Sequence, residues 1–284
     1  MRSRTGKKER RLFIPEAVRW ISNPVFPAAV ILSMVLFMAD LFSEPLLSNM
    51  LLDGEPRTVA VFFQGFGGMI RYVGLCLCSL PAAGFYAEEY GGNAVYMRVQ
   101  RMGGGRYAMS RILHVFSSAW LCAFLAVILN LLVLVAGFGH ILLEEGDSLS
   151  FLPGDNNWLY LLKQGHVWSA YFVMAVIQGF QAAFYALLAL AFSVIVPDRR
   201  AVFAIPLLGW YFNEHMLVHL EWLPSWLLPS MIYDESHVLV SVFSVGEWEL
   251  FWIVAGYTVA AAVCVYLFLL FSLRRNGTFG GESE

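Results

Sequence analysis

Residues 85–111 read FYAEEYGGNAVYMRVQRMGGGRYAMSR and form a polar segment of mixed charge between two long apolar runs. A few residues are enough to connect two membrane spans, whereas this connection is long enough for a helix lying on the membrane surface. The segment begins with the acidic pair Glu88 and Glu89 and ends with glycines and basic residues. This pattern is typical of a docking element that a membrane protein presents to a cytoplasmic partner.

The composition of the chain is that of a membrane protein. Hydrophobic residues make up 59% of the 284 residues and charged residues 14%, against about 45–50% and about 25% in soluble domains. A spanning helix needs about 20 mainly apolar residues, whereas spanning strands give shorter, alternating segments. The sequence therefore predicts an all-α polytopic membrane protein that forms one domain over residues 1–284. Its six spans are expected at residues 25–43, 62–85, 113–138, 168–196, 201–220 and 250–273.

The basic residues indicate the orientation. Seven Lys or Arg precede the first run, four lie between the second and third, two between the fourth and fifth, and two follow the sixth, so 15 of the 18 lie on one side. The positive-inside rule assigns this side to the cytoplasm. Both termini are therefore predicted to be cytoplasmic, and the membrane is expected to be a bacterial plasma membrane.

Two further elements are predicted at the edges of the bundle. Over Arg11–Ile21 apolar and charged side chains interleave, which favours a short helix in the inner interface beside anionic lipids. The residues before it are expected to form a solvated basic tail. On the outer side, Pro224 and Pro229 break the apolar stretch 222–233, so we expect it to re-enter the outer leaflet or to cap the bundle.

The sequence offers little for catalysis. It has no phosphate-binding loop of the form G-x-x-x-x-G-K-[ST], and the glycine run at 103–105 opens a membrane span, so we interpret it as a flexible turn. The four cysteines lie in apolar runs, where free cysteine behaves as a small hydrophobe. We predict no catalytic residue, no metal and no cofactor on this chain, and no nucleic-acid partner. Any ATP and Mg²⁺ must be bound by another subunit.

The centre of the polar segment has the spacing of a helix with two faces. Val95, Val99 and Met102 recur on one face of Ala94–Met102, with arginines elsewhere. A rigid element anchored to spans at both ends can transmit work from a soluble motor into a membrane bundle; the alternative is a surface loop whose charges are merely solvated. We predict a coupling helix over residues 87–102, with the docking residues Glu88, Glu89, Tyr90, Val95, Arg98, Val99 and Arg101.

Polar residues within the spans are candidates for a transport path, because ionisable groups in the bilayer face the bundle interior or water. His215 and His219 are four residues apart, on one face of the expected fifth helix, and Glu214 lies about 100° away. These residues either line a path or are structural residues near the outer interface. Arg71 either begins the second span and extends outward or belongs to the path. The predicted path residues are Gln178, Gln181, Asn213, Glu214, His215 and His219.

The chain resembles the permease subunits of type-2 ABC exporters in its six spans, cytoplasmic termini, interfacial N-terminal helix and acidic residue closing the second span. Glu89-Tyr90-Gly91 stands where that family has its acidic residue and following glycine, and Arg98–Arg101 stands near the end of its coupling helix. Tyr107–Arg111, YAMSR, resembles the basic lead into the third span. Gly91-Gly92-Asn93 departs from the pattern, in which a basic residue and a helix former are common.

This resemblance implies a transport subunit with no nucleotide site of its own. It implies a dimer, formed with a second copy or a sister permease, within membrane lipid. Two cytoplasmic ATPase subunits would hold ATP and Mg²⁺ and dock on the coupling helix. The cargo would be a peptide, a lipid or an amphipathic drug, moved outward.

A rival prediction is an intramembrane metalloprotease of the prenyl-endopeptidase type, which would use Glu88 and Glu89 together with His215 and His219. The order H-E-x-x-H is absent, and the arginine expected beyond the glutamate pair falls on Asn93. We expect the glutamates at the inner face and the histidines nearer the outer face, separated by most of the bilayer. A membrane scaffold without catalytic activity is a third alternative.

Overall fold

The computed structural model describes residues 23–43, 73–83, 85–91, 94–138, 166–220, 222, 224, 228–233 and 247–275. Within these ranges the regular elements are helices and no strand occurs. In chain order they are α2 (Val25–Ser43), α5 (Leu75–Ala83), α6 (Phe85–Gly91), α7 (Ala94–Met102), α8 (Gly104–Phe138), α10 (Val167–Ile195), α11 (Arg199–His215), the 3-10 helix η3 (Leu217–His219), α12 (Pro229–Tyr233) and α14 (Glu247–Arg275).

Three of the described helices are long and apolar enough to cross a membrane: Gly104–Val133 in α8, Tyr171–Ile195 in α10 and Phe251–Arg275 in α14. They overlap the third, fourth and sixth predicted runs, which are the runs without Asp, Glu, Lys or Arg. The chain is therefore a helical membrane protein, as its composition predicts. Helix α2 has the bounds of the first predicted run, and the full number of six spans stays a prediction.

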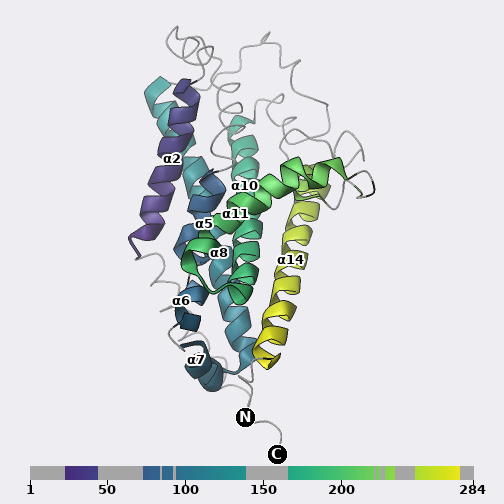
Figure 1. Ribbon diagram of the computed structural model, residues 1–284. Coiled ribbons are helices and arrows are strands. Elements are labelled where there is room, and N and C mark those ends of the chain that lie inside the picture. The colour runs from purple at the N-terminus through teal and green to yellow at the C-terminus, as the bar shows by residue number, and fades with distance from the viewer. Residues whose placement is uncertain are drawn as a thin grey trace, which may run out of the picture.

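Helix α10 is the centre of the bundle. It packs against α8, α14, α5 and α11, and 83% of its most apolar window is buried within the chain, against 22% for α14. In Figure 1, α2 and α14 lie on opposite sides of the bundle, with α8 and α10 between them, and α11 runs obliquely across it. Most of the surface of α14 is therefore left for lipid or for another chain.

Close packing of α8 on α10 depends on a glycine. A Cβ added at Gly179 of α10 would lie 2.7 Å from Nε1 of Trp120 on α8. The Trp120 ring is held in place because it stacks on Phe124, with ring centroids 5.0 Å apart. Small residues at helix contacts let backbones approach closely, which is how membrane helices gain packing energy.

The helix that contains the third predicted span begins before that span. Helix α8 begins at Gly104, whereas the predicted span begins at Leu113. The corner before the helix is Gly103, whose φ of 81° suits glycine because glycine has no Cβ. The glycine run is therefore a turn only at its first residue. At Gly105 an added Cβ would lie 3.3 Å from the Tyr266 hydroxyl, so a small residue there lets α8 approach α14.

Two other helices also end differently from the prediction. Helix α6 ends at Gly91 and α7 begins at Ala94, so the coupling helix predicted over 87–102 is two helices. The two residues between them, Gly92 and Asn93, have low helix propensity. Helix α11 ends at His215 rather than at residue 220. Its 17 residues rise about 26 Å, which is less than the hydrocarbon core of about 30 Å.

Near the start of α14, α12 packs into the bundle. Leu228, Ile232 and Tyr233 are buried. The hydroxyl of Tyr233 lies 2.6 Å from Thr258 Oγ1, and the Thr258 hydroxyl itself donates to the Val254 carbonyl at 2.8 Å. Tyr233 is therefore the donor in this pair, and α12 caps the bundle by bonding to α14. The predicted interfacial helix Arg11–Ile21 and residues 62–72, with Arg71, lie outside the described residues.

Candidate functional site

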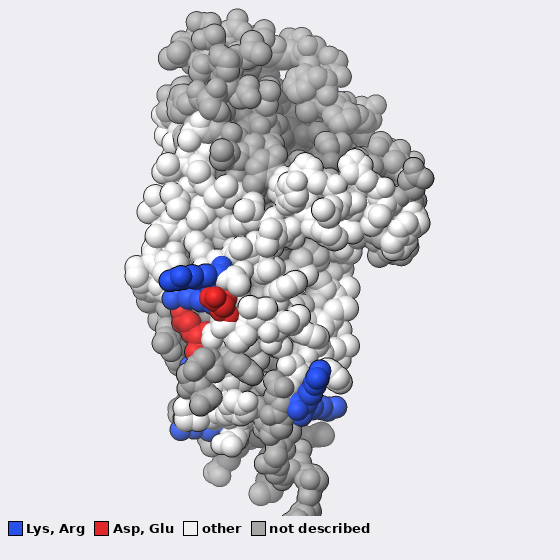
Figure 2. All heavy atoms as spheres, in the orientation of Figure 1, with Lys and Arg blue, Asp and Glu red and all other residues white. Residues whose placement is uncertain are grey.

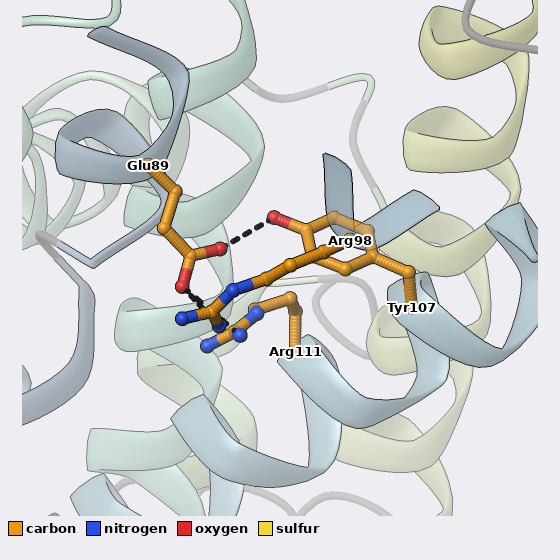
Figure 3. A network of polar contacts seen from close by, with 4 residues as sticks. All are labelled: Glu89, Arg98, Tyr107 and Arg111. Atoms are coloured by element: carbon orange, nitrogen blue, oxygen red, sulfur yellow. Dashed lines mark hydrogen bonds and ion pairs between the residues drawn. The ribbon is translucent and has the colours of Figure 1, made fainter. Parts of the chain in front are cut away.

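The acidic pair lies on α6, at the end of the bundle where α7 lies below α8. The Glu89 carboxylate is surrounded by three side chains (Figure 3). One oxygen pairs with Arg98 of α7 at 2.6 Å and with Arg111 of α8 at 3.0 Å. The other accepts a hydrogen bond from the Tyr107 hydroxyl of α8 at 2.8 Å. We call these four residues the Glu89 cluster; it joins α6, α7 and α8.

Burial makes the Glu89 cluster more than a surface ion pair. The side chains of Glu89 and Arg111 are 11% and 7% exposed, and that of Arg98 is 32% exposed. The Arg111 guanidinium carbon also lies 5.3 Å from the centre of the Tyr107 ring, within the range of a cation–π contact. Removing one partner from a buried pair is strongly destabilising, because the remaining charge is left in a poorly hydrated site. The cluster therefore fixes how α6, α7 and α8 sit together.

The neighbouring acid, Glu88, points elsewhere. It pairs with Arg199, the first residue of α11, at 2.5 Å, and both side chains are about half exposed. Arg199 also lies over the Phe203 ring, at 5.3 Å. Asp198 caps α11 by accepting a hydrogen bond from the Arg200 amide at 2.9 Å. The two adjacent glutamates thus connect α6 to α7 and α8 on one side and to α11 on the other.

Helix α7 has the two faces that its sequence predicts. Val95 and Val99 are buried in the same cluster as Tyr86, Tyr107 and apolar residues of α10 and α14. Met97 is 53% exposed, and Gln100 and Arg101 are exposed beside it. We call Met97, Gln100 and Arg101 the open face of α7. Figure 1 places α7 across the end of the bundle.

Helix α8 is longer than a membrane span needs. Its 35 residues rise about 52 Å, about 20 Å more than the hydrocarbon core. Its two arginines, Arg106 and Arg111, lie in its first part, so we expect this part to project from the membrane. In Figure 2 the basic side chains of the visible face lie in the lower half of the molecule, where α7 is, with acidic side chains beside one basic group.

The structure divides the predicted docking residues into two groups. Glu88, Arg98 and Arg101 reach the surface. Glu89 is largely enclosed by its three partners, and Val95 and Val99 face the bundle. These last three are corrected from direct contacts to residues that hold α7 in place, because a buried side chain cannot meet a partner. The side chain of Tyr90 lies outside the described part of the chain.

The predicted path residues do not share one surface. Gln178, Gln181 and Asn213 are buried, whereas His215 and His219 are exposed. The histidines also do not share a helix face as expected, because α11 ends at His215 and His219 lies in η3. The His215 ring lies 4.5 Å from that of Tyr211.

Asn213 is the most deeply buried of the predicted path residues whose side chains the structure describes. It is 2% exposed, and within the described part of the chain neither its amide nitrogen nor its amide oxygen has a hydrogen-bond partner. A buried polar group left without a partner costs about 1–3 kcal/mol. The side chain of Glu214 lies outside the description.

The rival metalloprotease gains no support from this geometry. Glu88 pairs with Arg199 at the start of α11, and His215 is the last residue of that helix. The two ends of α11 are about 24 Å apart, whereas zinc ligands lie about 2 Å from the metal. Both glutamates are engaged by arginines. The glutamates and histidines therefore do not converge on one centre.

Two members of the Glu89 cluster were not among the predicted site residues. Tyr107 and Arg111 are four residues apart and so share one face of α8. This spacing of polar residues at the start of an apolar helix is visible in the sequence, and it could have indicated a shared contact. What the sequence could not indicate is that both would meet Glu89, because this depends on the corner at Gly103.

Comparison with protein-family models, with curated proteins and with solved structures finds no match to this chain. The fold and the Glu89 cluster define a helical membrane protein with a bonded polar junction at one end of its bundle. Its function must be inferred from these residues.

Proposed function

We propose that this chain is the membrane-spanning permease subunit of an ATP-driven exporter, and that α7 is the element on which a separate ATPase subunit docks. The observation that supports this most strongly is the attachment of α7. Its buried valines and the Glu89 cluster fix it to the bundle, while its open face is left uncovered by the described residues.

A coupling element must be stiff to pass on a movement. A push on α7 reaches α8 through Arg98, Glu89 and Arg111. It also reaches α11 through Glu88 and Arg199, since both glutamates lie on α6. A solvated loop would change its own conformation under the same push and would not pass the movement on to the spans. The polar junction therefore suits a transmission element better than a passive connection.

The open face of α7 indicates the chemistry of its partner. Met97 offers an apolar anchor, and Arg101 offers a positive charge at its side. Methionine adapts to irregular apolar surfaces. A complementary groove would have an apolar floor and an acidic rim, carried by a cytoplasmic ATPase subunit that holds ATP and Mg²⁺.

The remaining parts of the proposal follow from an exporter of this kind. Two ATPase subunits would serve two permease chains in a bacterial plasma membrane, with the termini in the cytoplasm. The cargo, a peptide, lipid or amphipathic molecule, would move along the interior side of α10 and α11. Of the predicted path residues, Asn213 is the one we propose to meet it, because both of its amide atoms are buried without a hydrogen-bond partner among the described residues.

The docking proposal is tested by co-expression with the ABC ATPase encoded nearest to this chain. Arg101→Glu should weaken co-purification by about tenfold, equivalent to about 1.4 kcal/mol. Arg275→Glu is the matched control, because Arg275 is also an exposed arginine, on α14, and its change should leave association intact. Equal loss in both variants, or ATP hydrolysis by the isolated chain, would contradict the proposal.

The orientation is tested separately by cysteine labelling. A cysteine at Gln100, which is exposed on α7, should react with an impermeant maleimide only after the inner face is opened. A cysteine at Ser148 should react in intact cells. Labelling of the Gln100 site from outside would overturn both the orientation and the docking proposal.

A further inference from the structure

Helix α14 is the least enclosed of the three candidate spans. Only 22% of its most apolar window is buried within the chain, and in Figure 1 it lies at one side of the bundle. In its second half the large apolar side chains Leu267, Phe268 and Phe271 are exposed. We call these three residues the apolar stripe of α14. The residues on the opposite side of this part of the helix are buried: Val265, Leu269 and Leu273.

Two arginines continue the apolar stripe at the end of the helix. Arg274 and Arg275 are the last residues of α14, and both are exposed. Residues three or four positions apart share a helix face, and Phe271 lies three and four positions before them. Leu273, by contrast, is buried in one cluster with valines of α7. The two arginines, which we call the α14 arginine pair, therefore lie on the exposed side of the helix.

No acidic side chain in the described part of the chain forms an ion pair with the α14 arginine pair. Glu88 and Glu89 pair with arginines of α7, α8 and α11, and Asp198 caps α11. Glu249 lies near the other end of α14, about 37 Å away along the helix. These four are the acidic residues whose side chains the structure describes. Two adjacent positive charges thus border an exposed apolar surface.

We propose that this end of α14 is a binding site for an anionic phospholipid. The lipid phosphate lies against the α14 arginine pair, since guanidinium groups bind phosphate oxygens through charge-assisted and often bidentate hydrogen bonds. The acyl chains lie along the apolar stripe. One leaflet of the hydrocarbon core is about 15 Å deep, which equals the rise of about ten helical residues. Ten residues before the arginine pair stands Cys264, which is also exposed.

A phospholipid fits this surface better than a soluble anion does. Free phosphate could bind the arginines but would leave the apolar stripe uncovered. A zwitterionic lipid could cover the stripe, but its own positive group would lie beside the two arginines. An anionic lipid satisfies both requirements. This inference needs neither an ATPase partner nor a particular orientation in the membrane, so it stands or falls independently of the proposed function.

Helix α11 offers a comparison within the same chain. It also has two arginines at one end, Arg199 and Arg200, and exposed leucines farther along. Its arginines are balanced by acids, however, because Glu88 pairs with Arg199 and Asp198 caps the helix beside Arg200. The charges of these four residues sum to zero. We therefore expect no preference for anionic lipid at this end of α11.

The test is native mass spectrometry of the full chain in a neutral detergent. The chain is mixed with equal amounts of phosphatidylglycerol, which is anionic, and phosphatidylcholine, which is zwitterionic, carrying the same acyl chains. The ratio of the two lipids among the first bound molecules is measured. The unchanged chain should enrich phosphatidylglycerol. Arg274→Gln and Arg275→Gln should each lower the ratio about fivefold, because an arginine near an anionic surface contributes about 1 kcal/mol.

Three controls separate the parts of the site. Arg200→Gln removes an exposed arginine of α11 and should keep the ratio. Phe271→Ala removes apolar contact that both lipids share, so it should reduce the total lipid bound and leave the ratio unchanged. Glycerol phosphate at millimolar concentration has the charge without the acyl chains and should not displace the bound lipid.

Four outcomes would overturn the proposal. Equal binding of the two lipids to the unchanged chain would show that the site does not select an anionic lipid. An equal fall of the ratio in Arg200→Gln and Arg274→Gln would assign the preference to overall charge. Displacement by glycerol phosphate would show a site for a free phosphate group. An unchanged amount of bound lipid in Phe271→Ala would refute the position of the acyl chains.

Discussion

Replacing Glu89 with glutamine removes the carboxylate that pairs with two arginines and keeps the shape of the side chain. Arg111 is 7% exposed and cannot regain its hydration when the pair is lost. Breaking a buried pair by removing one partner costs about 3–5 kcal/mol. Tyr107 keeps an acceptor in the amide oxygen, so its loss is limited to the difference between a charge-assisted and a neutral hydrogen bond, about 1 kcal/mol.

The structure also provides a matched comparison within the same cluster. Arg98 is 32% exposed, so after Arg98→Gln the Glu89 carboxylate still has Arg111 and Tyr107. An exposed pair contributes about 0–1 kcal/mol. We therefore expect Glu89→Gln to destabilise the chain by about 3–5 kcal/mol and Arg98→Gln by less than about 1 kcal/mol.

Thermal unfolding of the purified chain in detergent, followed by circular dichroism, measures this difference. On the size scaling of folded proteins, 1 kcal/mol shifts the Tm by about 2–4 °C, so Glu89→Gln should lower the Tm by about 10 °C and Arg98→Gln by a few degrees at most. A double-mutant cycle of Glu89→Gln with Arg111→Gln should show coupling above about 1 kcal/mol. Equal, small Tm shifts in the two single variants would show that the Glu89 cluster is solvated. They would refute the conclusion that it holds α6, α7 and α8 together.

Two further predictions concern packing and the outer cap. Gly179→Ala should cost about 1–3 kcal/mol, because the new Cβ would lie 2.7 Å from Trp120 Nε1. Gly256→Ala should keep or raise the Tm, because nothing lies within 4 Å there and alanine is the better helix former. Equal Tm values for both variants would contradict the close approach of α8 and α10. Tyr233→Phe removes the hydrogen bond to α14 and should cost about 0.5–1.5 kcal/mol. The expected result is faster proteolysis next to α12. Unchanged proteolysis would show that α12 is held by burial alone.

The apolar runs predict the fold most reliably. The three runs without acidic or basic residues are the three candidate spans, and the fourth run, 168–196, matches α10 within a residue at each end. Hydrophobicity is an additive property of neighbouring residues, so it can be read from one stretch alone. Hydrophobicity does not show that α8 begins at Gly104, because residues 104–112 are too polar to be predicted as part of a span. In this part of the helix Tyr107 and Arg111 both bind Glu89 of α6.

The sequence predicts which segment forms the site, but not what each of its residues contacts. Composition and spacing identify the polar segment and the amphipathic character of α7. They cannot tell whether Val95 and Val99 face a partner or the bundle, since both surroundings are apolar. They also cannot pair Glu89 with Arg111, because the contact needs α6 to end at Gly91 and the chain to turn at Gly103.

The adjacency of Glu88 and Glu89 explains why one junction can connect so many helices. Successive residues on a helix point about 100° apart, so two neighbouring acids on α6 reach different sides. Glu89 reaches inward to α7 and α8, and Glu88 reaches outward to α11. A single acid could hold only one of these sides, and two acids spaced one turn apart would face the same side. Glu88 and Glu89 together therefore let α6 join α7 and α8 to α11. A movement of α7 must strain the contacts of Glu89 with α8, those of Glu88 with α11, or both.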